Sequence, residues 1–205
     1  MSGKVKLDAL VTKLGEYPGR DAAQADGVQP EGQYFQTVTS ITKLGTLTET
    51  VPANANRFGQ SVAVNGNGTL IAVGAIRGDA GGLDQGCVHV YSVNSAGLPT
   101  LLYSFGSPGG AVGCQFGRAL AMSADGTRLA VGEVYSGATV TNAGRVHLYT
   151  LGATSATLTS SLLAPTPVAN AGFFRVAVSG DGNTLAVGDN TLNSSQGVVR
   201  VYLRV

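Results

Sequence analysis

Short apolar stretches, separated by residues that favour tight turns, recur along most of the chain. Residues 70–73, Leu-Ile-Ala-Val, form one such stretch, which is typical of a strand that is buried on both faces. Before it, Val62 and Val64 alternate with smaller residues, and Asn67-Gly68 lies between the two segments. An Asn-Gly pair supplies the positive φ angles that a two-residue hairpin turn requires. The pattern therefore predicts two antiparallel strands joined by a tight turn.

This hairpin pattern occurs three times along the chain. The copies are residues 58–74, 116–132 and 173–188, and their turns contain Asn67-Gly68, Asp125-Gly126 and Asp181-Gly182. Each copy is followed by a glycine and an alternating apolar segment that ends in tyrosine, at residues 86–91, 144–149 and 197–202. The first two copies are in register without a gap, whereas the third is shorter in its later loop. A match of this length and order identifies an internal repeat.

Two more strands are expected in each repeat. Val88 and Val90, like Val146 and Leu148, alternate with other residues and predict a third strand with a period of two. Residues 99–104 provide a less regular fourth strand in the first repeat. Four antiparallel strands at a period of ~57 residues are typical of propeller blades more than of helical solenoids. We therefore predict an all-β fold of antiparallel four-stranded blades, which form a partial β-propeller.

The repeat resembles a known family of blades. A Phe-Gly pair at residues 58–59 is followed by an apolar strand, an Asn-Gly turn, a second strand that ends in Ala-Val-Gly and a strand that ends in Val-Tyr. This order is similar to the FG-GAP repeats of the integrin α-subunit propeller and of its bacterial and viral relatives. The resemblance covers roughly residues 33–205 and implies the blade type.

Two departures from that family affect the expected chemistry. In integrin blades a longer loop, rich in Asp and Asn, binds calcium between the first two strands, whereas residues 65–68 here are only Asn-Gly-Asn-Gly. This connection lacks the series of acids that could supply six or more oxygen ligands. We therefore expect no calcium site of that kind, and we predict no other metal and no cofactor. Phe174 replaces the glycine of the Phe-Gly pair in the third copy, which indicates an altered or terminal blade.

The predicted domain organisation has two parts. Residues 1–32 contain an apolar stripe with helical spacing (Leu7, Leu10, Val11, Leu14) and then a polar segment rich in Pro and Gly. We expect a short N-terminal helix or an extended arm here, which either docks on a neighbouring subunit or covers one end of its own domain. The blade repeats follow as a partial blade at 33–57 and as three repeats at 58–115, 116–172 and 173–205.

Three repeats and a partial one are too few to close a propeller, which needs roughly four to eight blades. Sheet edges and apolar faces would then stay uncovered, which favours aggregation unless another element pairs with them. Two copies could complete a six-bladed ring, or the chain could pack against a different protein. Alternatively, the early strands could close the third blade and give a three-fold, β-prism-like domain. We favour assembly with another chain.

Composition narrows the classes of partner. Hydrophobic residues make up 43% of the chain and charged residues only 12%, with thirteen Lys and Arg against twelve Asp and Glu. This balance gives no broad charged surface for nucleic acid or an anionic membrane. No apolar run approaches the ~18 residues of a membrane-spanning helix, and Asp8 interrupts any signal-peptide core. The two cysteines, Cys87 and Cys114, are interpreted as reduced thiols of a chain made in the cytosol rather than as one disulfide.

Residues that could carry chemistry are few. The two histidines, His89 and His147, occupy the same position of adjacent repeats, and we interpret them as strand-surface residues. No nucleophile motif and no phosphate loop is present, so we expect no enzyme. Acids in loops that would share one rim of the blades are candidate binding residues, with solvated turn acids as the alternative interpretation. These acids are Asp79, Asp84, Glu133 and Asp189.

These observations lead to two hypotheses about function. The first is a non-enzymatic structural or interaction protein that serves as a building block of a larger assembly. The specific form that we favour is a virion component, such as a phage tail, fibre or capsid-surface protein. Its partners would be further copies of itself or other subunits. The second is a monomeric adhesin-like or carbohydrate-binding module, which would bind a surface glycan or protein. Neither hypothesis involves nucleic acid or a membrane span.

Overall fold

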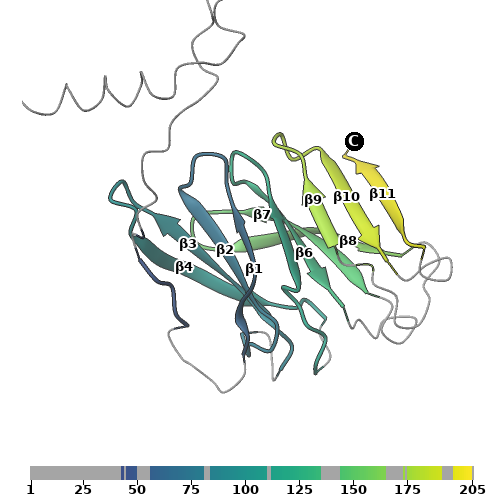
Figure 1. Ribbon diagram of the computed structural model, residues 1–205, viewed down its shortest axis with the longest axis horizontal. Coiled ribbons are helices and arrows are strands. Elements are labelled where there is room, and N and C mark those ends of the chain that lie inside the picture. Colours follow the sequence, from purple (N-terminus) through teal and green to yellow (C-terminus); the bar gives the residue numbers. More distant parts are fainter. Residues whose placement is uncertain are drawn as a thin grey trace, which may run out of the picture. The chain divides into compact units, whose positions relative to one another are not determined.

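The computed structural model describes residues 43, 45–49, 56–80, 84–109, 112–134, 144–164, 173, 175–190 and 196–204. All of these except Lys43 lie in one compact unit, Leu44–Val205. Within them the chain forms three antiparallel sheets and no helix (Figure 1). The predicted helix or arm at residues 1–32, and most of the partial blade at 33–57, lie outside the described residues.

Each sheet corresponds to one copy of the repeat. The first contains β1 (Phe58–Val64), β2 (Leu70–Ala75), β3 (Cys87–Val93) and β4 (Pro99–Gly106), in that order. The second contains β5 (Ala119–Met122), β6 (Arg128–Glu133), β7 (Arg145–Leu151) and β8 (Ala156–Leu163). The third contains β9 (Arg175–Val178), β10 (Thr184–Asp189) and β11 (Val198–Leu203). The predicted antiparallel blades are confirmed, and the third sheet has three strands among the described residues.

The predicted tight turns join the first two strands of each sheet. Asp125 shows how its side chain holds such a turn, because Oδ1 accepts hydrogen bonds from the Thr127 amide (2.9 Å) and the Ser123 hydroxyl (2.5 Å). These hydrogen bonds, led by the one from Ser123, lower the pKa of Asp125 from 3.8 to about 2. Gly126 follows with a φ of 75°, as the turn requires. Asp181 holds the third turn in the same way and its pKa is also lowered.

The turns also connect neighbouring sheets. The Gly66 amide donates to the Ala124 carbonyl (2.9 Å), and the Ala124 amide donates to the Gly180 carbonyl (2.8 Å). These three residues occupy the same place in three consecutive turns. Of the first strands, β5 contacts both β1 and β9. This is the arrangement of the inner strands of a propeller.

Two apolar layers separate the three sheets. Between the first and second sheets, Val88 and Val90 pack with Phe116 and Tyr149, and the Phe105 and Tyr149 ring centroids are 4.8 Å apart. Between the second and third sheets, buried Phe173 and Val187 pack against Val146. The first and second sheets therefore each bury one face against the sheet that follows in the chain.

Candidate functional site

In each of the three sheets, one strand carries a basic side chain that lies close to a carboxylate. His89 in β3, His147 in β7 and Arg200 in β11 occupy equivalent positions, because they pair across the ladder with Val73, Val131 and Val187. Their carboxylate partners are Glu49 at 3.5 Å, Glu133 at 3.1 Å and Asp189 at 3.9 Å. The sequence predicts the equivalence of the two histidines but not these partners.

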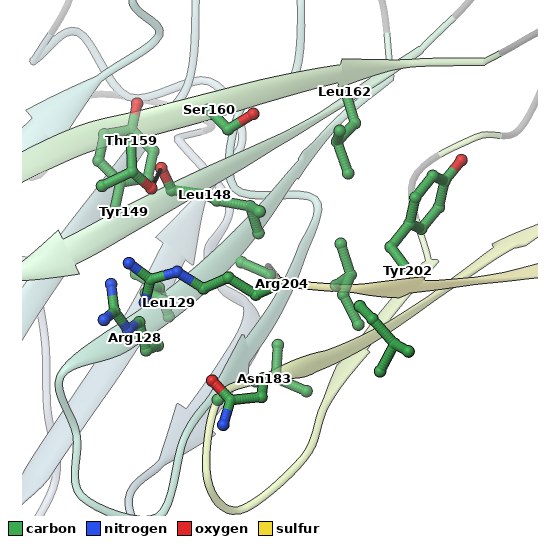
Figure 2. Close-up of a pocket in the computed structure, with 15 residues that line it drawn as sticks. Arg128, Leu129, Leu148, Tyr149, Thr159, Ser160, Leu162, Asn183, Tyr202 and Arg204 are labelled. Carbon is green, nitrogen blue, oxygen red and sulfur yellow. Dashed lines mark hydrogen bonds between the residues drawn. The ribbon is translucent and has the colours of Figure 1, made fainter.

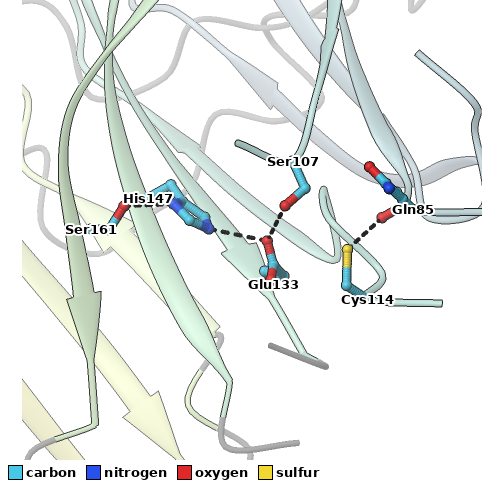
Figure 3. A network of polar contacts seen from close by, with 6 residues as sticks. All are labelled: Gln85, Ser107, Cys114, Glu133, His147 and Ser161. Atoms are coloured by element: carbon cyan, nitrogen blue, oxygen red, sulfur yellow. Dashed lines mark hydrogen bonds and ion pairs between the residues drawn. The ribbon is translucent and has the colours of Figure 1, made fainter. Parts of the chain in front are cut away.

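In the cluster of the second sheet, a buried histidine and a buried glutamate contact two serine hydroxyls (Figure 3). His147 Nε2 lies 3.1 Å from Glu133 Oε2, and its Nδ1 lies 2.8 Å from the Ser161 hydroxyl. The Ser107 hydroxyl, just after β4, donates to the same Glu133 oxygen at 2.7 Å. His147 and Glu133 are buried, so these contacts provide the hydrogen bonds that buried polar groups require. The arrangement ties the end of the first sheet to the second.

The cluster of the first sheet has the same plan with different donors. Ala75 occupies the position of Glu133, and the acid is instead Glu49, which lies before β1 as Ser107 lies before β5. Glu49 Oε2 accepts a hydrogen bond from the Asn56 amide at 2.9 Å. His89 Nδ1 lies 2.7 Å from the Ser104 hydroxyl. The first cluster therefore also pairs its histidine with a carboxylate, although this carboxylate comes from another segment of the chain.

In the first cluster a thiol contacts the histidine directly. Cys87 Sγ lies 3.2 Å from His89 Nε2, and the two residues share one face of β3 because they are two positions apart. Burial raises the pKa of the Cys87 thiol to about 11, with a smaller contribution from the Glu49 charge. Burial also lowers the pKa of His89, an effect that Glu49 opposes. At neutral pH the cluster therefore holds a protonated thiol and a neutral imidazole.

The structure places the predicted site residues in two environments. Asp79 and Asp84 are exposed in the connection between β2 and β3, where the Asp84 amide donates to Asp79 Oδ1 at 2.8 Å. Glu133 and Asp189, by contrast, end β6 and β10 and are buried, so their side chains do not lie on an exposed loop. The four acids are therefore not presented together on one open surface.

The histidines require a correction. Both were expected on the strand surface, yet His147 is fully buried and His89 is 8% exposed. His147 lies between the first and second sheets, whereas His89 lies on the opposite face of the first sheet, beside Glu49 and Phe58. In both cases a hydroxyl and a carboxylate contact the two ring nitrogens. The position of Cys87 beside His89 could have been inferred from their spacing, since alternate strand residues share a face.

Cys87 and Cys114 are both free thiols, and Cys114 donates to the Gln85 carbonyl at 3.0 Å (Figure 3).

A pocket of about 330 Å³ lies between the second and third sheets (Figure 2). Leu148, Leu162 and Leu185 contribute to its apolar part, while Arg128 and Arg204 contribute charged groups. The equivalent space between the first two sheets is filled, because Tyr103 and Phe105 stand there in the register positions of Ser160 and Leu162. Smaller side chains on β8 thus account for the pocket.

Comparison with known proteins supports the type of repeat. The family model described as FG-GAP repeat matches residues 42–91. No curated protein matches the chain. Similar solved structures include the periplasmic gluconolactonase PpgL of Pseudomonas aeruginosa, which is 20% identical over 70% of this chain and 38% of its own, with a TM-score of 0.49.

Two further similar structures are Sqt1 of Saccharomyces cerevisiae and the RRP9 WD40 repeats. The chain of the RRP9 WD40 repeats is 13% identical over 75% of this chain and 40% of its own, with a TM-score of 0.44. Sqt1 is 11% identical over 74% of this chain and 37% of its own, with a TM-score of 0.42. The aligned part of this chain thus spans well under half the length of each of these structures. In the part of the chain that the structure describes, no helix has the length and apolarity to cross a membrane.

Proposed function

We propose that this chain, which carries an FG-GAP repeat and is built of β-propeller blades, is a non-enzymatic building block of a larger assembly. The observation that carries the proposal is a pair of uncovered apolar faces, one on the first sheet and one on the third. In an assembly, blades of another chain would cover both faces. We take a second copy of this chain as the partner.

The outer face of the third sheet exposes three large apolar side chains of β11. Val199, Val201 and Leu203 of β11 are 70%, 66% and 73% exposed. The ladder registers make Val201 equivalent to Val90 of β3, which is 1% exposed because the next sheet covers it. Burial of such side chains is favourable by about 1.5 to 3 kcal/mol each. The third sheet is thus equipped to pack against a further blade.

The first sheet has a matching face at its inner strand. Val62 and Val64 of β1 are 59% and 57% exposed. Their equivalents in the second sheet, Leu120 and Met122, pack against the apolar layer of the preceding sheet. The exposed face of β1 therefore lacks the sheet that would precede it. A head-to-tail contact between two copies would join this face to that of β11.

The pairing of the strands in the third sheet supports the same contact between two copies. Among the described residues β11 pairs only with β10, so one edge of the third sheet is open. Residues 45–49 precede β1 as the end of β4 precedes β5, and they place Glu49 where Ser107 stands. By this relation residues 45–49 correspond to the end of the fourth strand of a preceding blade. The described residues of a second copy provide no strand at that place beside β11, and two copies with three blades each would make a six-bladed ring.

The absence of an enzymatic role is part of this proposal. The titratable side chains of the polar clusters, His89, His147, Glu133 and Asp189, are buried in the described structure. As the specific assembly we propose a virion component, such as a tail, fibre or capsid-surface protein, which suits a chain with only 12% charged residues. Electron microscopy of the particle or complex that contains the chain tests this part directly.

Light scattering during gel filtration tests the assembly itself. The chain is expected to elute with twice its mass of 20.7 kDa. Val201→Asp and Val62→Asp, on opposite faces, should each yield a monomer, because a charge would be buried in the contact. Leu98→Asp is the matched control, since Leu98 is 51% exposed in the turn before β4 and lies on neither face. A wild-type chain that stays monomeric at every concentration contradicts the proposal.

The pocket between the second and third sheets favours a second candidate, a recognition module that binds a glycan or another small ligand. Its size is in the range of small-molecule sites, and Arg128 and Arg204 could donate to ligand oxygens. Glycan-array binding by a monomer, lost in Arg204→Ala, would support this function over assembly.

A further inference from the structure

We propose that Glu49, Cys87 and His89 form a binding site for a divalent zinc-type metal ion. The ligands would be Glu49 Oε1, Cys87 Sγ and His89 Nε2, which all lie within 4.8 Å of one another. This site is distinct from the calcium loop of integrin blades, and it does not depend on the proposed assembly. A zinc-type ion would thereby link residue 49 to β3.

The donor set suits this class of ion. Zinc binds thiolate, imidazole and carboxylate ligands at about 2.0 to 2.3 Å, and three protein ligands leave a fourth position for water. Sγ and Nε2 are 3.2 Å apart, and Nε2 and Oε1 are 3.5 Å apart, so one ion can contact all three atoms after small side-chain shifts. A calcium ion would instead require six or more oxygen ligands.

Neighbouring groups already orient two of the three ligands. Ser104 Oγ contacts His89 Nδ1 at 2.7 Å, which leaves Nε2 directed at the thiol and the carboxylate. Asn56 Nδ2 donates to Glu49 Oε2 at 2.9 Å, which leaves Oε1 directed at His89. Metal-binding histidines commonly have their second ring nitrogen held in this way.

The other two sheets show that the combination belongs to the first sheet alone among the described residues. At the position of Cys87 they carry Arg145 and Val198, as the ladder registers show. The second sheet keeps the histidine and an acid at His147 and Glu133, and Cys114 lies near Glu133 and Ser107, but among the described residues only Glu49, Cys87 and His89 bring three such ligand atoms within 4.8 Å of one another. The second sheet thus provides an internal comparison in which arginine takes the place of the thiol ligand.

The ion would have a path from solvent and a defined proton balance. The side chains of His89 and Glu49 remain 10% and 13% exposed. Cys87 would release its thiol proton to solvent as its sulfur forms the bond to the ion, and the carboxylate and neutral imidazole would bind without losing a proton. The bound ion would hold residues 45–49, which precede the first blade, against β3.

Cobalt provides the spectroscopic test. Full-length chain, stripped with a chelator and kept reduced, is titrated with Co²⁺ alone. We expect a thiolate-to-cobalt charge-transfer band and tetrahedral d–d bands that saturate at one ion per chain and disappear when Zn²⁺ is added. Cys87→Ser should abolish the charge-transfer band, whereas Cys114→Ser, the other buried thiol, should retain it.

A second pair of variants avoids the buried cysteines. Ser104→Ala should weaken Co²⁺ binding by roughly 10- to 100-fold, the usual effect of losing a group that orients a metal ligand. Ser161→Ala removes the equivalent contact to His147 and should leave binding unchanged. Failure to bind Co²⁺ at one equivalent would overturn the site, as would a band that survives Cys87→Ser or weakens equally in both serine variants. Since the readout is metal binding, these results are independent of whether the chain forms a dimer.

Discussion

Gly74 lies directly against the backbone of Gly117. A Cβ atom at position 74 would fall 2.1 Å from the Gly117 carbonyl oxygen, and Gly117 itself has a φ of 84°. Gly117 is the glycine of the Phe-Gly pair in the second repeat, and Gly74 ends the Ala-Val-Gly segment of the first. The two glycines that mark the repeat thus allow the start of one sheet to approach the preceding sheet.

This contact predicts a large loss of stability for Gly74→Ala. The added methyl group cannot avoid the backbone carbonyl, so the two sheets must move apart, at a cost of about 3 kcal/mol. Chemical denaturation monitored by circular dichroism measures the free energy of unfolding. Gly109→Ala is the control, since no atom lies within 4 Å of a Cβ at that position. Equal effects of the two substitutions would contradict the explanation.

A second prediction concerns the buried pair His147 and Glu133 of the second sheet. Glu133→Ala leaves His147 Nε2 and the Ser107 hydroxyl without their acceptor, and should lower the free energy of unfolding by about 3 kcal/mol. The first sheet supplies the compensating change, because it combines Ala75 with Glu49. The double variant Ser107→Glu, Glu133→Ala copies that arrangement and should regain at least half of the loss. If urea denaturation shows the double variant to be less stable than Glu133→Ala, the two clusters are not equivalent.

The third prediction is a dependence of stability on pH that comes from the hairpin turns. The pKa of Asp125 in the folded chain, about 2, is below its ordinary value of 3.8, because the Ser123 hydroxyl and Thr127 hydrogen-bond to the ionised form. Ionised Asp125 therefore stabilises the fold above about pH 4, and this contribution is lost as the pH falls from 3.8 through about 2.

Thermal denaturation between about pH 6 and pH 2 measures this effect. Asp125→Asn should lower the melting temperature at the upper end of the range and differ less from wild type at the lower end. Asp84→Asn, in an exposed connection away from the hairpin turns, is the control. A constant difference between Asp125→Asn and wild type over the whole range would contradict the role of the charge.

The sequence predicts most of the blade architecture, because strands and turns depend on local patterns. The Asn-Gly and Asp-Gly pairs lie at the turns, and the apolar runs beginning at Leu70 and Leu129 lie in buried strands. The repeat places His89 and His147 at equivalent positions. Its period also reveals that the third blade, which ends with Leu203, lacks a fourth strand among the described residues.

The candidate sites are less predictable because their partners are distant in sequence and change between repeats. Glu49 reaches His89 from a segment forty residues earlier in the chain, whereas Glu133 reaches His147 from the adjacent strand. Alternation along a strand shows which residues share a face, but not what covers that face. The burial of His147 therefore follows only once the first sheet is in place, and that of His89 only once Glu49 and Phe58 lie over it.

The last prediction concerns the pocket between the second and third sheets. Leu162 lines this pocket, while Phe105 fills the equivalent space between the first and second sheets and contacts Tyr149. Leu162→Phe should fill part of the pocket and raise the free energy of unfolding by about 1 kcal/mol, the usual gain from filling a cavity. The reciprocal change, Phe105→Leu, should lower it by a similar or larger amount because it opens a space in a packed layer. Urea denaturation of both variants distinguishes the two interfaces: if Leu162→Phe destabilises the chain as much as Phe105→Leu does, the space beside Leu162 is not available to an aromatic ring.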